Sequence, residues 1–144
     1  MVIVKKMEIM FIGLIFFILF SCNERPSLYN EYLASPKNPK VSPSGKYLLH
    51  VIEGYDGQVH FNRFEIMGKK EQNIIFSSKD YFRTRDTLFF LWDKEDRVWV
   101  YSGDLGTFYW IYEQNGQWIK HAYSKENIEA PKFLKQIRPK YHSK

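Results

Sequence analysis

Residues 87–123 decide the fold, and they read TLFFLWDKEDRVWVYSGDLGTFYWIYEQNGQWIKHAY. This stretch contains four short segments rich in β-branched and aromatic residues, which favour β-strands, and turn residues separate the segments. The last turn contains Asn115-Gly116, two residues that both tolerate the positive φ of a tight hairpin. The four segments are residues 87–92, 97–101, 107–113 and 117–123. Strands that follow one another through short turns predict an antiparallel meander.

Three more β-rich segments precede this stretch, at residues 46–53, 58–66 and 73–76. Helical segments do not alternate with them, which excludes a parallel α/β fold. The sequence therefore predicts an all-β domain over residues 45–123, an antiparallel meander of about six to eight strands. Its sheets form either a small sandwich or propeller-blade-like units, with a short C-terminal helix or tail beyond them.

Several of these strands are apolar on both faces. In residues 107–113, Phe108 and Trp110 point one way and Tyr109 and Ile111 the other, as alternation requires. Either both faces are covered, or one face exposes aromatic rings to a ligand. Aromatic residues on strands more often pack in the core than bind a ligand. The candidate aromatic binding surface consists of Trp92, Trp99, Tyr101, Tyr109, Trp110, Tyr112 and Trp118.

The composition of the chain limits the classes of protein to which it can belong. The chain has 144 residues, 44% hydrophobic and 18% aromatic, which fits one globular domain and excludes disorder over the whole length. A single cysteine excludes a disulfide framework.

Residues 1–21 predict a secretory signal peptide. Lys5 and Lys6 form a positive start, and the apolar run over residues 9–20 follows. This run is shorter than the roughly 20 residues that a membrane-spanning helix needs.

Leu19-Phe20-Ser21-Cys22 resembles the lipobox of bacterial lipoproteins. The resemblance implies that Cys22 carries acyl chains such as palmitate and becomes the first residue of the mature chain. It also implies membrane anchoring in the cell envelope. Asn23 is not the aspartate that favours inner-membrane retention in this class, so we expect the outer membrane.

Residues 22–44 predict a lipidated tether. Pro26, Pro36, Pro39 and Pro43 remove backbone donors and favour extended chain, and serines lie between them. Such a segment would hold the β domain away from the bilayer.

Residues 124–144 predict a basic C-terminal tail. Residues 22–124 carry equal numbers of basic and acidic groups, whereas residues 125–144 carry six basic and two acidic ones. A balanced domain is unlike a nucleic-acid binder, which would show a basic stripe on the domain itself. We expect a solvated tail, frayed over residues 142–144, that is separable from the fold and attracts anionic lipid. The alternative is that Phe133, Leu134 and Ile137 dock on the domain.

A second, local resemblance lies in residues 42–49, SPSGKYLL, which are similar to the strand openings of TolB-like and WD40-like β-propeller blades. This resemblance implies four-stranded antiparallel units and gives no information about function.

The sequence contains no G-x-S-x-G, H-E-x-x-H or P-loop motif. His50, His60 and His121 fall on predicted strands, where isolated polar groups are expected more often than a metal site. The acidic turn at residues 93–96 lacks the ligand spacing of a calcium loop and is expected to be solvated. These observations predict neither an enzyme nor a cofactor.

The function that follows is a membrane-anchored envelope lipoprotein whose small β domain binds a partner. One alternative is a glycan- or peptidoglycan-contacting module that uses exposed aromatics. Another is an immunity protein against an exported toxin. Solvent exposure of the tryptophans separates the glycan alternative from the others.

Overall fold

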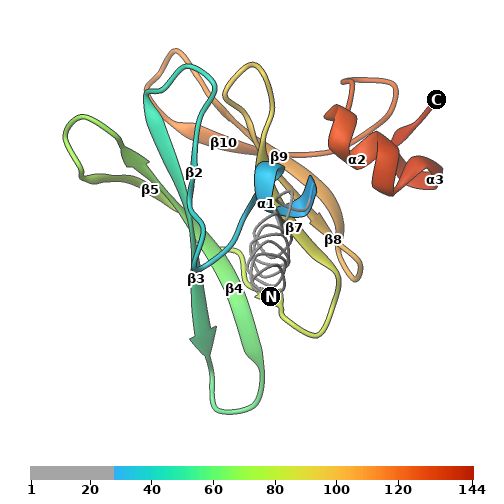
Figure 1. Cartoon of the computed structure of the whole chain (residues 1–144), viewed down its shortest axis with the longest axis horizontal. Helices are drawn as coiled ribbons and strands as arrows, with labels where there is room; N and C mark the ends of the chain where they lie inside the picture. The colour runs from blue at the N-terminus through green and yellow to red at the C-terminus, as the bar shows by residue number, and fades with distance from the viewer. Residues whose placement is uncertain (1–27) are drawn as a thin grey trace, which may run out of the picture.

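The computed structural model describes residues 28–144, and the predicted signal peptide and Cys22 lie outside them. Two antiparallel sheets pack face to face, and short helices at the C-terminus cover the outer face of one sheet (Figure 1). None of the helices in residues 28–144 is long and apolar enough to cross a bilayer. The predicted all-β antiparallel fold is confirmed.

Sheet I contains the predicted meander. Its strands lie in the order β1-β7-β8-β9-β10, and all neighbours are antiparallel. The four meander strands match the four predicted segments to within one residue at each end. The strands of sheet I are β1 (Leu33–Ala34), β7 (Leu88–Trp92), β8 (Val98–Ser102), β9 (Gly106–Tyr112) and β10 (Trp118–Ala122).

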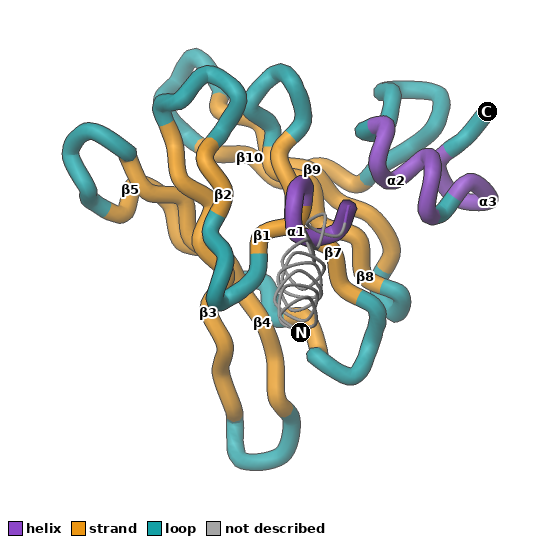
Figure 2. The backbone as a smooth tube through the Cα atoms, in the orientation of Figure 1, coloured by secondary structure: helices purple, strands orange, loops and turns teal. Residues whose placement is uncertain are grey.

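Sheet II is built on one long hairpin. Strands β3 and β4 pair over nine residues each, and their closed end extends beyond the rest of the molecule (Figures 1 and 2). Strand β2 pairs with β3, and β5 and β6 both pair with β4. The strands are β2 (Lys40–Val41), β3 (Tyr47–Tyr55), β4 (His60–Gly68), β5 (Ile74–Ser77) and β6 (Phe82–Arg83).

The β9–β10 turn contains Asn115-Gly116 at its tip, as predicted, but its geometry differs. Only Gly116 has a positive φ, at 80°. The amide of Glu113 donates to the carbonyl of Gln117 over 2.8 Å, which leaves three residues in the loop. A longer loop needs one left-handed position instead of two, and Gly116 supplies it.

The main core lies between the two sheets. Leu49, Val51, Phe64 and Ile66 of sheet II face Val98, Val100 and Trp110 of sheet I. Each buried aliphatic or aromatic side chain of this kind stabilises the fold by about 1.5–3 kcal/mol. Alternation then sends the intervening residues of sheet I outward, as the sequence predicts.

A second core covers the outer face of sheet I. Trp99, Tyr101 and Tyr109 pack there against Phe133 and Leu134 of α2. The prediction of a separable, solvated tail is therefore wrong, because these two side chains are buried and cover an apolar sheet face. The helices are α2 (Lys132–Ile137) and α3 (Pro139–His142).

The tether is also shorter than predicted. Helix α1 (Leu28–Tyr32) precedes β1, and β1 and β2 both pair within the sheets. Residues 33–34 and 40–41 thus belong to the domain, because their backbones pair with β7 and β3, and the extended chain that nearby prolines favour is compatible with this pairing.

Candidate functional site

The predicted aromatic surface is mostly interior. The structure buries Trp99, Tyr101, Tyr109, Trp110 and Trp118, divided between the two cores. Trp92 is half-buried, and its indole N–H donates to the carbonyl of Lys40 over 2.8 Å. Tyr112 alone of the seven is exposed, at 50%. These residues therefore do not form a continuous open surface.

Three of the seven do meet at one end of the sandwich. Trp92, Tyr112 and Trp118 surround Tyr47, with ring centroids 5.4–6.4 Å from its own. Burial, reinforced by the neighbouring Tyr112 and Asp96, raises the pKa of Tyr47. This cluster closes the end of the main core.

Exposed aromatics gather instead at the opposite end, at the closed end of the β3–β4 hairpin. We call residues 54–61 the hairpin tip. Tyr55 is 58% exposed, and its ring stacks on His60 with centroids 4.6 Å apart. On the opposite face of the hairpin, Phe61 meets Tyr81 edge to face at 4.5 Å, and Tyr81 is 59% exposed. The closed end of the hairpin thus carries aromatic side chains on both faces, and the exposed Tyr55 and Tyr81 do not belong to either core.

The hairpin tip is held by its own hydrogen bonds. The Asp56 carboxylate accepts from the amides of Gln58 and Val59, at 2.9 and 2.8 Å. These backbone donors hold the pKa of Asp56 below its usual range. The Tyr55 hydroxyl donates to the carbonyl of Gly57 over 2.8 Å. The exposed rings are therefore presented by a preorganised loop, which lowers the entropy lost on binding.

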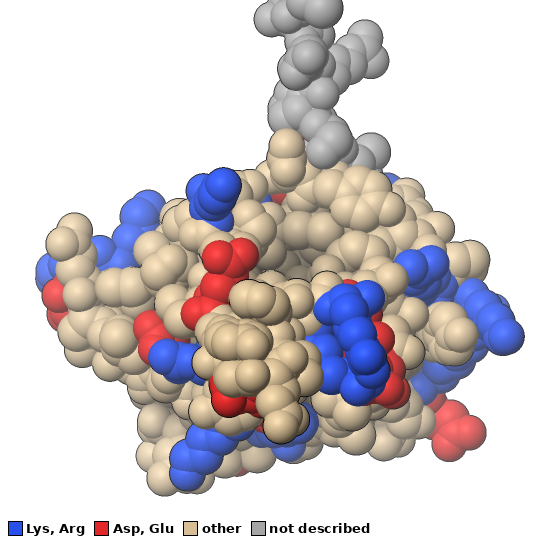
Figure 3. Space-filling view, turned by 90° about the horizontal axis from the view of Figure 1, so that it is seen from below, with Lys and Arg blue, Asp and Glu red and all other residues tan. Residues whose placement is uncertain are grey.

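The surface around the tip carries charges of both signs. Figure 3 views the molecule from below, so that this end faces the reader, with uncharged residues between scattered Lys/Arg and Asp/Glu groups. An uncharged patch with a polar rim is typical of a protein-binding surface.

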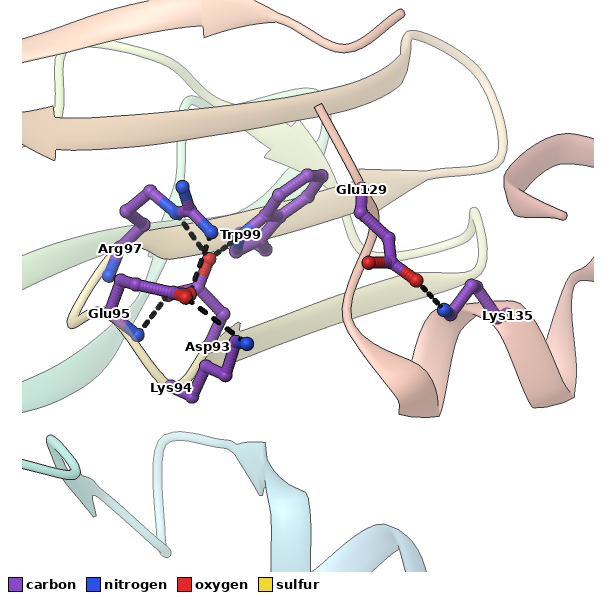
Figure 4. Close-up of polar contacts among 7 residues, drawn as sticks. All are labelled: Asp93, Lys94, Glu95, Arg97, Trp99, Glu129 and Lys135. Atoms are coloured by element: carbon purple, nitrogen blue, oxygen red, sulfur yellow. Dashed lines mark hydrogen bonds and ion pairs between the residues drawn. The ribbon is translucent and has the colours of Figure 1, made fainter. Parts of the chain in front are cut away.

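The acidic turn between β7 and β8 has a structural role that the sequence analysis missed. Asp93 was expected to be solvated, but it is buried and accepts hydrogen bonds from the indole of Trp99 and from Arg97 (Figure 4). Its other oxygen accepts from the amides of Glu95 and Arg97, both at 3.0 Å. The carboxylate thus fixes the turn and satisfies the buried Trp99.

His142 is the second residue whose place was predicted wrongly. It was expected in a frayed end, but it is only 2% exposed. Its Nδ1 lies 3.0 Å from the carbonyl of Arg138, so this nitrogen carries the proton, and Nε2 accepts from the Thr107 hydroxyl at 2.8 Å. Burial lowers the pKa of His142. The hydrogen bond between His142 and Thr107 thus connects α3 to β9.

The other three histidines lie apart. His50 faces Glu65 across the β3–β4 ladder, His60 stacks on Tyr55, and His121 stacks on Tyr109. Within residues 28–144, no group of three or more His, Cys, Asp or Glu side chains is arranged to hold a metal ion.

Sequence reasoning did not single out the hairpin tip. A turn between the segments at residues 46–53 and 58–66 is predicted, with Tyr55 as a turn residue and His60 and Phe61 as strand residues, and no binding role is predicted for any of the three. The available signal was a glycine-bounded turn, Gly54-Tyr55-Asp56-Gly57, flanked by aromatics. No known family model, curated protein or solved structure matches this chain.

Proposed function

We propose that this chain is an envelope lipoprotein, anchored by acyl chains on Cys22, whose β domain binds a protein partner through the hairpin tip. The lipobox-like sequence at residues 19–22 supports the anchor. One observation carries the binding part: Tyr55 is exposed on a projecting hairpin whose loop is fixed by Asp56, and exposed Tyr81 of the β5–β6 connection packs on the same hairpin through Phe61. Aromatic residues are enriched among interface hot spots.

A protein partner fits the tip better than a glycan. One face of the Tyr55 ring is covered by His60, and Phe61 packs edge to face with Tyr81, so no pair of open ring faces lies side by side. Aromatic side chains on both faces of a projecting hairpin suit a protein partner that encloses its closed end and buries both pairs inside a polar rim. If the chain is an immunity protein, the partner is an exported toxin.

The anchor is tested by metabolic labelling with radioactive palmitate. The wild type is expected to incorporate label, and the Cys22→Ser variant is not, because Cys22 is the only cysteine. Equal labelling of the two chains would refute the anchor.

The binding surface is tested by replacing Tyr55 with a photoreactive amino acid in living cells. Tyr112 gives the matched control, since it is similarly exposed but lies beside the β9–β10 turn at the other end of the sandwich (Figure 1). We expect one discrete adduct from position 55, reduced by Tyr81→Ala, and none of that mass from position 112. The same adduct from both positions, or no adduct from 55, would refute the tip as the binding surface.

A further inference from the structure

The basic residues of the C-terminus are gathered in space, not spread along a free tail. A hollow of about 700 Å³ beside α2 and α3 is lined by Lys125, Lys132, Lys135 and Lys144, with Glu129 as the one carboxylate side chain among its lining residues. Lys135 pairs with Glu129, and the ammonium of Lys125 donates to the carbonyls of Lys140 and Ser143. Lys132 and Lys144 are exposed at the surface of this hollow.

This basic region adjoins the first described helix. The rings of Tyr29 and Tyr32 in α1 each lie 5.7 Å from the ring of Phe133 in α2. Lys132 and Lys135 line both the hollow and a neighbouring groove that includes Tyr32. Tyr29 and Tyr32 are 49% and 47% exposed. Half-exposed tyrosines and lysines therefore share one surface, which we call the α1–α2 face.

The α1–α2 face is close to the proposed anchor. Six residues lead from Cys22 to Leu28, and an extended chain spans at most about 3.6 Å per residue, or about 20 Å in all. Because α1 is the first described element and lies within this reach of Cys22, the surface around α1 is able to touch the bilayer.

We propose that the α1–α2 face docks on the anionic phospholipid bilayer that holds the lipid anchor. Tyrosine rings suit the interface between headgroups and acyl chains, and each lysine near an anionic surface adds attraction of about fivefold in binding. The contact supplements the acyl chains and fixes the orientation of the domain. This inference rests on the proposed lipid anchor on Cys22.

The test uses the full lipidated chain, purified from membranes and reconstituted in vesicles of phosphatidylcholine, alone or equimolar with phosphatidylglycerol. Since the only native cysteine would be acylated, Tyr32→Cys takes a single fluorescent label, and Ile74→Cys on β5 gives a control label on the other side of the molecule (Figure 1). Nitroxide-bearing lipid in the vesicle quenches a label that touches the bilayer.

We expect quenching at position 32, stronger in the anionic vesicles, and little at position 74. The double variant Lys132→Gln/Lys144→Gln should lower the equilibrium constant for docking by about fivefold per lysine, whereas Lys69→Gln/Lys70→Gln in the β4–β5 turn should not. Chains that float with the vesicles but show equal, weak quenching at both positions would overturn the docking and leave the anchor intact. Chains that do not float would overturn the anchor, and this inference with it.

Discussion

The ring of Phe61 lies across the backbone of Gly54, its direct partner on the neighbouring strand. A Cβ built on Gly54 would approach Cζ of Phe61 to 2.3 Å. Glycine is therefore needed here for close approach, because the ring occupies the space that any side chain would take. The same ring meets Tyr81, so this pair supports the aromatic group of the hairpin tip.

Replacing Gly54 with alanine should displace Phe61 and loosen the tip. We expect Gly54→Ala to lower the free energy of unfolding by about 1–3 kcal/mol and to reduce adduct formation from position 55. Gly103→Ala is the control, because its Cβ would lie 3.5 Å from the nearest atom, an ordinary contact. Urea unfolding measures both variants. Equal stability and equal adduct yield in the two would contradict the role given to Gly54.

Removing the Asp93 carboxylate should destabilise the β7–β8 turn. Asp93→Ala leaves the Trp99 indole and the Nε–H of Arg97 without their acceptor, and loss of one partner of a buried pair costs about 3–5 kcal/mol. Glu95 shares Arg97 but is largely solvated, so Glu95→Gln should cost less than about 1 kcal/mol. Thermal unfolding compares them, and similar melting temperatures would count against this account.

Helix α2 should be essential to stability despite its charge. Phe133→Ala removes a buried ring from the second core, for an expected loss of about 3–5 kcal/mol. Gln136→Ala on the exposed side of the same helix should change stability by less than about 0.5 kcal/mol. If chemical denaturation gives the two variants equal midpoints, α2 does not belong to the fold.

His142 should make stability depend on pH. Burial lowers its pKa below 6.5, so between pH 6.5 and that lower value the unfolded chain binds more protons than the folded one. The contribution of His142 is therefore complete above about pH 6.5 and is lost as the pH falls through this interval. The nearby charges of Lys125 and Arg138 act in the same direction.

Melting temperatures measured from pH 8 to pH 5 test this dependence, with the limits spanning the ordinary histidine pKa of about 6.5. The His142→Gln variant should show a shallower fall toward acid than the wild type. His60→Gln, which changes an exposed histidine, should keep the wild-type slope. An unchanged slope in His142→Gln would show that another group is responsible.

The long strands could be predicted because their evidence is local. Residues 87–123 combine strand-forming residues with turn sequences at short intervals, and each segment became a strand. Strands β1, β2 and β6 have only two residues each, and their existence depends on neighbours distant in sequence. No local pattern marks such strands, so they were missed.

The site was harder to predict because it depends on register and on contacts between segments. Whether Tyr55 stacks on His60 follows from which residues of β3 and β4 face each other. Likewise, the burial of Asp93 depends on the hydrogen bond from Trp99, which lies on the next strand. The prediction for residues 124–144 is wrong because it rests on their charge alone. Phe133 is buried because the outer face of sheet I is apolar and needs a cover, which the charge of the segment does not indicate.

The contact between Tyr29 and Phe133 joins residues near the two ends of the domain. The outer face of sheet I therefore stays open until the last twenty or so residues have been delivered. A chain that emerges from its N-terminus therefore cannot complete this fold until α2 has emerged. A product cut short before α2 would expose Trp99, Tyr101 and Tyr109 together, and such an apolar surface promotes aggregation and recruits chaperones.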